Sequence, residues 1–263
     1  MEIPIYQVDA FTGRPFGGNP AAVCPLQSWP DDALMQAIAA ENNLAETAFF
    51  VRNGNGYHLR WFTPEIEIDL CGHATLATAH VLFHHLGHAG DTISFSSMSG
   101  PLSVRKKDGR IELDFPARDP APATLPPVIA EGIGAQPLEV LKARDYVLLL
   151  RDEAEVRALT PDRQRLDRIN IDPGGIIVTA PGRHADFVSR FFTPQAAIFE
   201  DPVTGSAHCS LVPYWARKLG KTTLVAQQVS RRAGTLWCEL AGDRVRMAGE
   251  AVTYLEGKIR VNL

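Results

Sequence analysis

An internal repeat is the feature of this 263-residue sequence that most constrains its fold. Arg60-Trp61-Phe62-Thr63-Pro64 returns as Arg190-Phe191-Phe192-Thr193-Pro194. Two further pairs follow in the same order, after a small insertion in the second copy: Gly72-His73-Ala74 with Gly205-Ser206-Ala207, and Leu86-Gly87 with Leu219-Gly220. Self-similarity at a fixed spacing is typical of a duplicated architecture. The sequence therefore predicts two similar halves, each with a strand, an acidic loop and a helix that begins at Gly-x-Ala.

A proline-dense segment, Arg118–Pro127, predicts the boundary between the halves, since such composition favours an extended connection. We expect a first domain over residues 1–117 and a second over 128–263, while the last strand, around 251–263, can return to either domain. The predicted fold class is α+β, with two pseudo-symmetric domains that each wrap a strand-rich layer round a central helix.

Local signals place the elements of the first half. Ser28-Trp-Pro-Asp31 is typical of a helix start, with proline near the first turn, and Asn42-Asn43 of its end. Leu34, Ala37 and Ile38 fall at helical spacing and predict its buried stripe.

Two hairpins and an apolar helix complete the predicted first half. Asn53-Gly-Asn-Gly56 separates the strands Thr47–Val51 and Tyr57–Phe62, and Asp108-Gly109 marks a second hairpin turn. Residues Ala74–Leu86 form an Ala-rich segment with few charges, which predicts a helix covered on most sides.

Composition limits the function classes. The formal net charge of −4 and the pI near 6.1 provide no overall positive field for nucleic acid or anionic lipid. The N-terminus lacks a signal-peptide pattern, and no apolar stretch approaches the length of a transmembrane helix. We expect a soluble, cytoplasmic protein with no nucleic-acid partner and no membrane association.

Cofactor and metal motifs are missing from the sequence. It contains no GxGxxG after a strand, no GxxxxGK[ST], no GxSxG and no HExxH, and its four cysteines form no CxxC pair. His80, His84 and His88 share helical spacing, but no carboxylate accompanies them, so we interpret them as helix-end residues. The sequence predicts neither a cofactor nor a metal.

The two predicted helix starts indicate where an anion would bind. A glycine before a helix lets backbone N–H groups approach a ligand closely, and the helix dipole favours negative charge there. Polar side chains cluster in the sequence at both starts: Asp69, Cys71 and His73 at the first, and Glu200, Asp201, Thr204, Ser206 and His208 at the second. We therefore hypothesise that a small carboxylate substrate binds between the two domains.

Five segments together resemble the PhzF-like family of phenazine-biosynthesis isomerases, in the family's order and over nearly the whole chain. They are Asp9-Ala-Phe-Thr12, Phe16-Gly-Gly-Asn-Pro-Ala-Ala-Val23, Asn43-Leu-Ala-Glu-Thr47, Leu70-Cys-Gly-His-Ala-Thr75 and Glu200-Asp-Pro-Val-Thr-Gly-Ser-Ala-His208. The family is related to diaminopimelate epimerase and proline racemase. The resemblance implies two similar domains with a cleft, cofactor-free acid–base chemistry on a small carboxylate, and a homodimer.

The resemblance also implies roles for residues. Glu46 matches the family's proton-shuttling glutamate, although Ala45 stands where the isomerase has serine. His73 and Asp201 match its polar catalytic partners. The implied substrate-binding residues are Gly72, Gly205, Ser206 and Asn19. Abstracting a proton alpha to a carboxylate requires a base whose pKa is raised toward neutrality, which desolvation in a closed cleft would supply to Glu46.

Each of these residues also has a simpler interpretation. Glu46 could be a solvent-facing charge at a strand start, Asp201 a loop residue before proline, and His73 a first-turn polar residue. Cys71 stands where the isomerase has alanine, and a helix start would lower its pKa. A Cys71-dependent epimerase or racemase of an amino or hydroxy acid stays open, although its mate in the repeat is Thr204. The alternative of a non-catalytic small-molecule-binding or interaction protein also stays open.

Overall fold

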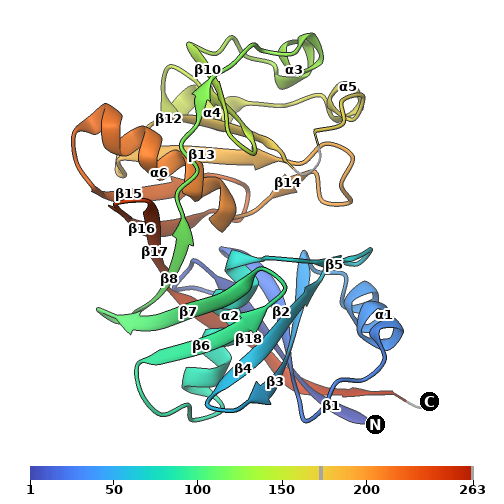
Figure 1. The fold of residues 1–263 in the computed structure, drawn as a ribbon. Helices are drawn as coiled ribbons and strands as arrows, with labels where there is room; N and C mark the ends of the chain where they lie inside the picture. Colours follow the sequence, from blue (N-terminus) through green and yellow to red (C-terminus); the bar gives the residue numbers. More distant parts are fainter. Residues whose placement is uncertain (172–173, 262–263) are drawn as a thin grey trace. The chain divides into compact units, whose positions relative to one another are not determined.

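The chain forms two compact units, here described from a computed structural model that covers residues 1–171 and 174–261 (Figure 1). One unit consists of Met1–Asp114 together with Ala248–Leu263, and the other of Phe115–Met247. In both units strands outnumber helices, and one long helix is largely buried. The predicted α+β fold class is confirmed.

The first unit contains α1, α2 and the strands from β1 to β8, with β18. Their bounds are β1 (Glu2–Ala10), β2 (Asn19–Leu26), α1 (Asp32–Asn42), β3 (Glu46–Asn53), β4 (Gly56–Phe62), β5 (Glu67–Ile68), α2 (Gly72–His84), β6 (Thr92–Ser97), β7 (Gly100–Lys107), β8 (Arg110–Pro116, whose end enters the second unit) and β18 (Ala251–Arg260).

The second unit contains the elements from β9 to β17. Their bounds are β9 (Ala121–Pro122), α3 (Pro127–Ile133), β10 (Glu139–Lys142), β11 (Tyr146–Leu149), α4 (Glu153–Ala158), α5 (Arg163–Leu166), β12 (Ile176–Pro181), β13 (Phe187–Phe192), β14 (Glu200–Asp201), α6 (Gly205–Leu219), β15 (Thr223–Gln228), β16 (Gly234–Ala241) and β17 (Arg244–Gly249, whose end enters the first unit).

The strand pairing repeats between the units. In the first, β4 is antiparallel to β3 and β5 and parallel to β6. In the second, β13 is antiparallel to β12 and β14 and parallel to β15. A long helix, α2 or α6, links the short strand to the parallel strand in each case. The duplication predicted from the repeated motifs is confirmed.

The arginine that occurs in both repeats forms an ion pair with a glutamate in the segment that precedes each long helix. Arg60 donates two hydrogen bonds to the carboxylate of Glu67, at 2.7 and 2.6 Å. Arg190 donates the same pair to Glu200, at 2.7 and 2.9 Å. Bidentate arginine–carboxylate pairs fix geometry as well as adding attraction. The repeat therefore preserves the ion pair that holds β5 or β14 against its neighbouring strand.

The terminal strand and the proline-rich segment each belong to one of the two units. β18 pairs antiparallel with β1 and so returns to the first unit. Within the proline-rich segment, β9 pairs with β10 and Pro127 opens α3. The other residues of the segment lie outside helices and strands, so the predicted extended connection is found over most of its length, and the whole segment belongs to the second unit.

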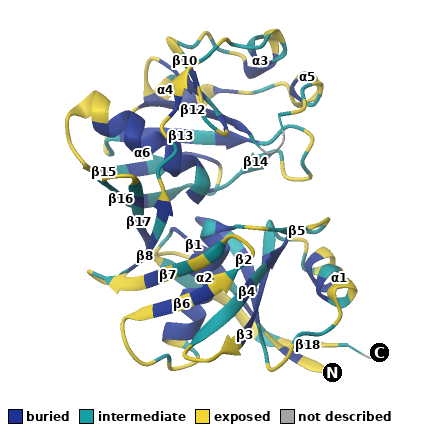
Figure 2. Cartoon of the chain, in the orientation of Figure 1, coloured by how far each residue is buried: buried dark blue, intermediate teal, exposed yellow. Residues whose placement is uncertain are grey.

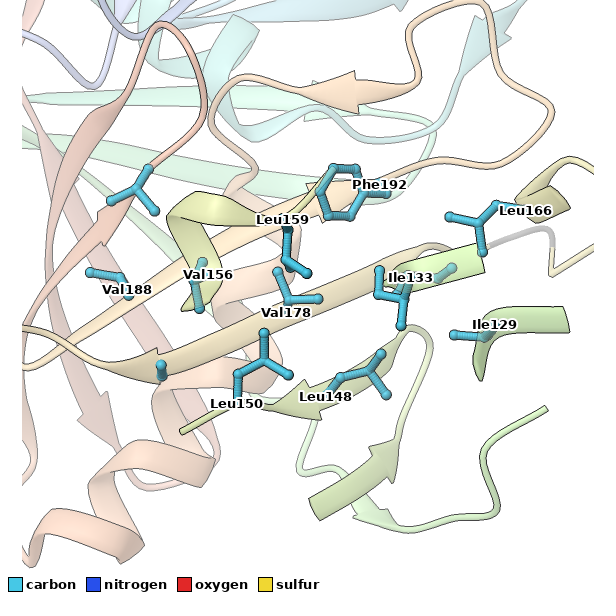
Figure 3. Close-up of a cluster of buried hydrophobic side chains, with 13 residues drawn as sticks. Ile129, Ile133, Leu148, Leu150, Val156, Leu159, Leu166, Val178, Val188 and Phe192 are labelled. Atoms are coloured by element: carbon cyan, nitrogen blue, oxygen red, sulfur yellow. The ribbon is translucent and has the colours of Figure 1, made fainter. Parts of the chain in front are cut away.

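Both units have apolar interiors. Every side chain of α2 from His73 to Phe83 is buried, and the helix packs on β1, β2 and β3 (Figure 2). In the second unit, a cluster of buried aliphatic side chains from α3, α4, β11 and β12 surrounds Val178, with Phe192 of β13 at its edge (Figure 3). The predicted covered helix is confirmed over residues 74–83, whereas its predicted end is wrong: the helix ends at His84, and Leu86 lies beyond it and is exposed.

Helix α1 corrects one sequence prediction. It begins after Asp31, whose side chain makes no capping hydrogen bond, and its buried residues are Met35, Ile38 and Ala39. Ala37, predicted to lie in the stripe, is exposed. The buried face instead includes Met35, which packs with Ile38 in a core cluster that also contains Phe49 of β3. Its predicted end is confirmed, since Asn43 adopts the left-handed conformation.

Both predicted hairpins are present. β3 pairs antiparallel with β4, and β7 with β8. Asp108 and Gly109 have φ angles of 51° and 76°, as a tight hairpin turn requires. Within the described residues, no helix combines the length and the apolar character needed to cross a membrane.

Candidate functional site

Two groups of polar side chains lie at the starts of α2 and α6, one in each unit. Cys71 and Thr204 precede these helices in extended backbone conformation, and neither side chain caps its helix. The first backbone N–H groups of both helices thus donate no capping hydrogen bond to these side chains. Helix N-termini of this kind attract anions through those groups and through the helix dipole.

Glu46 and His73 meet in the first unit. Glu46 opens β3, and His73 is the second residue of α2. Oε2 of Glu46 lies 3.0 Å from Nε2 of His73, and their side chains are 16% and 5% exposed. A carboxylate and an imidazole at this distance, screened from water, can exchange a proton directly. The two residues that the resemblance singled out therefore form one acid–base pair.

The other ring nitrogen of His73 contacts Cys71 and Asn19. Nδ1 of His73 lies 3.4 Å from Sγ of Cys71 and 3.2 Å from Nδ2 of Asn19. Asn19 is the first residue of β2 and is fully buried. The structure therefore brings together four of the predicted site residues, Asn19, Glu46, Cys71 and His73.

The charge state of this group follows from its burial. Desolvation raises the pKa of Cys71 to about 11, and the neighbouring Glu46 acts in the same direction. The expectation that the helix start lowers this pKa is wrong, because loss of hydration outweighs the dipole and the contact with His73. Burial acts to lower the pKa of His73, but Cys71 and Glu46 more than offset it and hold it well above 6.5.

A second polar group surrounds the start of α6. Oγ1 of Thr204 donates a hydrogen bond to Oδ2 of Asp201 at 2.5 Å. Gln228, at the end of β15, donates from Nε2 to the carbonyl of Asp201 at 2.7 Å and accepts from the backbone N–H of Thr204 at 2.8 Å. Gly205 and Ser206 then begin the helix. Sequence reasoning missed Gln228, which carries no local motif and reaches this loop only through the β13–β15 pairing.

His208 is a second residue whose position sequence reasoning left unassigned. It is fully buried on α6, its Nδ1 lies 2.8 Å from the carbonyl of Thr204, and its ring packs on Phe187. Burial lowers its pKa to about 4, against the opposing effect of the hydrogen bond to Thr204. His208 is therefore neutral at neutral pH and holds the helix start in place.

We expect this histidine to make the protein acid-sensitive. A buried histidine with a lowered pKa contributes stability above about pH 6.5, and loses it as the pH falls toward 4, because the unfolded chain takes up the proton first. By pH 4 the contribution of His208 to the free energy of unfolding should have fallen by about 3 kcal/mol, at about 1.4 kcal/mol for each pH unit. Urea unfolding of His208→Gln across this pH range should show a flatter decline than the wild type. The exposed His184→Gln is the control, and an equal decline in wild type and His208→Gln would contradict the assignment.

The duplicated architecture is chemically asymmetric. Cys71 corresponds to Thr204 and His73 to Ser206 by their positions at the two helix starts. Glu46 comes directly before Thr47, which pairs with Phe62. Gly175 comes directly before Ile176, which pairs with Phe192, the equivalent of Phe62 in the repeat. Gly175 therefore occupies the position equivalent to Glu46. A side chain at Gly175 would collide with the Phe191 ring, so no carboxylate fits there. Within residues 1–171 and 174–261, the acid–base pair at these equivalent positions therefore exists in the first unit alone.

The remaining predicted residues lie in the second unit. Asp201, Gly205 and Ser206 are close together at the start of α6, whereas the Glu46–His73 pair belongs to the first unit. Among the described residues, the donors close enough to share a metal ion are Glu46, Cys71 and His73. The three histidines of the predicted row do not share one contact: the rings of His80 and His84 lie 4.6 Å apart at a tilt of 36°, whereas His88 packs against Phe83.

Comparison with known proteins identifies the family. Residues 8–257 match the family model described as phenazine biosynthesis-like protein. The chain belongs to this family. Two proteins of Pseudomonas aeruginosa, both named uncharacterized isomerases, are 51% identical over 99% and 100% of this chain and the whole of their own length.

Solved structures agree with the family. A crystal structure of a PhzF family protein from Enterococcus faecalis is 49% identical, with a TM-score of 0.95 over 99% of this chain and 100% of that one. A probable proline racemase from Agrobacterium radiobacter shares the fold alone, at 11% identity and a TM-score of 0.64 over 99% of this chain and 93% of that one. The predicted family resemblance and the relation to racemase-like folds are confirmed.

Proposed function

We propose that this protein is a cofactor-independent isomerase that moves a proton on a small carboxylate-bearing metabolite. The observation that carries the proposal is the 3.0 Å approach of Glu46 to the buried His73 at a helix start. The names of the similar Pseudomonas proteins support the reaction class. Their names give no substrate, and the substrate class proposed here rests on the anion-favouring helix start.

In this mechanism Glu46 takes a proton from a carbon next to the substrate carboxylate and returns it to another carbon on the same face. The backbone N–H groups that follow Gly72 hold the substrate carboxylate. His73 donates from Nε2 toward Glu46 or the substrate and so stabilises the charge that develops. Asp201 stays a predicted catalytic partner, and Gly205 and Ser206 stay predicted substrate-binding residues. The homodimer and the cytoplasmic location also stay predictions.

Solvent exchange tests the reaction class even though the substrate is unidentified. The purified protein is incubated in D2O with a panel of small hydroxy, amino and dihydroaromatic acids, and deuterium uptake is read by mass spectrometry. Incorporation into a panel member supports an isomerase or epimerase. A ligand that raises the melting temperature without any exchange would instead support the non-catalytic binding protein.

The Cys71-dependent epimerase is the second candidate, favoured by the 3.4 Å contact between Cys71 and His73. A two-thiol mechanism needs a second thiol at the other helix start, where Thr204 stands. The raised pKa of about 11 also keeps Cys71 protonated at neutral pH.

We therefore expect Cys71→Ala to retain solvent exchange within a few-fold of the wild type. The substitution removes one small buried group and leaves the Glu46–His73 contact unchanged. Loss of exchange by roughly a hundredfold or more, the range expected for a general base, would favour the thiol mechanism, provided that the variant melts near the wild type. Cys209→Ala, a buried cysteine on α6, is the matched control.

A further inference from the structure

Three different metal-binding side chains converge beside the start of α2. One donor atom each from Glu46, Cys71 and His73 lies within 4.8 Å of the other two. Thiolate sulfur, imidazole nitrogen and carboxylate oxygen are the donors that zinc accepts in proteins. The sequence predicted no metal because it offered only the histidine row on α2, and no local spacing links Glu46 to the other two residues.

The spacing of two of these donors already fits a tetrahedral ion. Sγ of Cys71 and Nδ1 of His73 are 3.4 Å apart. Two ligands of a tetrahedral zinc, at bond lengths of about 2.3 Å to sulfur and about 2.0 Å to nitrogen, lie about 3.5 Å from each other. The Glu46 carboxylate has to swing closer, and it is the least buried of the three, with 16% of its side chain exposed.

A second observation concerns the contact that Glu46 would give up to reach an ion held by Sγ of Cys71 and Nδ1 of His73. Oε2 of Glu46 and Nε2 of His73 are buried and lie 3.0 Å apart, but within the described part of the chain neither has an aligned hydrogen-bond partner. Buried polar atoms without an aligned partner are costly, so moving the Glu46 carboxylate toward that ion breaks no well-formed hydrogen bond and provides the carboxylate with a partner. Since a tetrahedral ion takes four ligands, three protein donors would leave one position open.

The second unit provides an internal comparison. Its equivalent positions hold Gly175, Thr204 and Ser206, which offer no thiol, imidazole or carboxylate. The donor cluster is therefore a property of these three side chains and not of the duplicated fold. One site per chain is expected.

We propose that Glu46, Cys71 and His73 bind one thiophilic divalent cation of the zinc class. Binding replaces the Cys71 thiol proton, and any proton on Nδ1 of His73, with metal–ligand bonds and releases these protons to solvent, with no change of oxidation state. The bound ion occupies the carboxylate of Glu46. Reversible inhibition of turnover would follow, a consequence that rests on the proposed function, whereas the binding itself does not.

Cobalt is the probe, because tetrahedral Co²⁺ with a thiolate ligand gives intense sulfur-to-metal charge-transfer absorption. The full chain, stripped of metals with a chelator and kept reduced, is titrated with CoCl2 and then with ZnCl2. We expect one equivalent of Co²⁺ to produce the thiolate band and one equivalent of Zn²⁺ to abolish it. Binding without a thiolate band, or a band that does not saturate at one equivalent, would overturn the proposal.

Variants assign the ligands. Cys71→Ser should eliminate the band, while Cys209→Ser, the matched control, should keep it. Glu46→Gln and His73→Gln should weaken zinc affinity by at least about tenfold, the lower end of what losing even an outer-shell partner costs. If Cys71→Ser does not fold, these two variants decide: unchanged affinity in both would refute the site. Solvent exchange that persists without added metal, together with failed binding, would leave the proposed function intact.

Discussion

Replacement of Glu46 by glutamine is expected to abolish deuterium exchange while leaving the fold and ligand binding intact. The amide keeps the shape of the side chain but cannot accept the substrate proton, and a positioned general base contributes about 10²–10⁴-fold to rate. Exchange should therefore fall by that factor. Initial rates of deuterium uptake in D2O, compared at equal protein concentration, measure the effect.

Two controls make this result specific. Glu41→Gln removes an exposed glutamate of α1 and should leave exchange unchanged. Ligand-induced thermal stabilisation should persist in Glu46→Gln, since the helix-start N–H groups are untouched. A Glu46→Gln variant that still exchanges at the wild-type rate would rule out Glu46 as the proton shuttle.

Truncation of Trp215 to alanine is expected to have the largest effect on stability. Trp215 is 1% exposed, stacks on Phe187 at 5.6 Å, and donates from Nε1 to Oγ1 of Thr179 at 3.0 Å. It thereby anchors α6, which begins with the predicted substrate-binding residues, to β12 and β13. Loss of a buried tryptophan costs about 3–5 kcal/mol. The melting temperature should fall by about 10 °C in a chain of this size.

Trp215→Phe separates packing from hydrogen bonding. It retains an aromatic ring against Phe187 and loses the hydrogen bond to Thr179. We expect the lost hydrogen bond to lower the free energy of unfolding by about 1 kcal/mol, in addition to the effect of the smaller ring's weaker packing. Tyr254→Ala, at an exposed position of β18, should change the melting temperature little. A Trp215→Ala variant as stable as Tyr254→Ala would contradict the anchoring role.

The asymmetry between the two helix starts bears on both proposals. A duplicated fold provides two equivalent anion-favouring helix starts, but among the residues that the structure describes only the first has a carboxylate, an imidazole and a thiol this close together. The second carries the network of Asp201, Thr204 and Gln228, which joins that loop to the end of β15. The same backbone therefore carries the proposed proton-transfer pair at one start and a hydroxyl–carboxylate network at the other.

Local sequence patterns correctly predicted the features whose contacts lie between residues close in the sequence. The repeated Arg-x-Phe-Thr-Pro blocks predicted the duplication because each arginine binds a glutamate only a few residues away, Glu67 or Glu200. Turn residues such as Asp108-Gly109 predicted their hairpin because few residues adopt positive φ angles. The start of α1 was harder, since neither Ser28 nor Asp31 provides a side-chain cap and packing of Met35 chose the buried face.

Tertiary structure alone decided the state of the site. Motif resemblance singled out Glu46, Cys71 and His73, but only the packing of β3 against the start of α2 shows that they touch. Burial reversed the expected pKa of Cys71, because desolvation depends on everything packed round the thiol and not on its neighbours in sequence. Gln228 was missed for a similar reason, since strand pairing brings it to Asp201 and no local pattern relates the two. His208 was noted at the helix start, but its burial against Phe187, which lowers its pKa, is set by core packing.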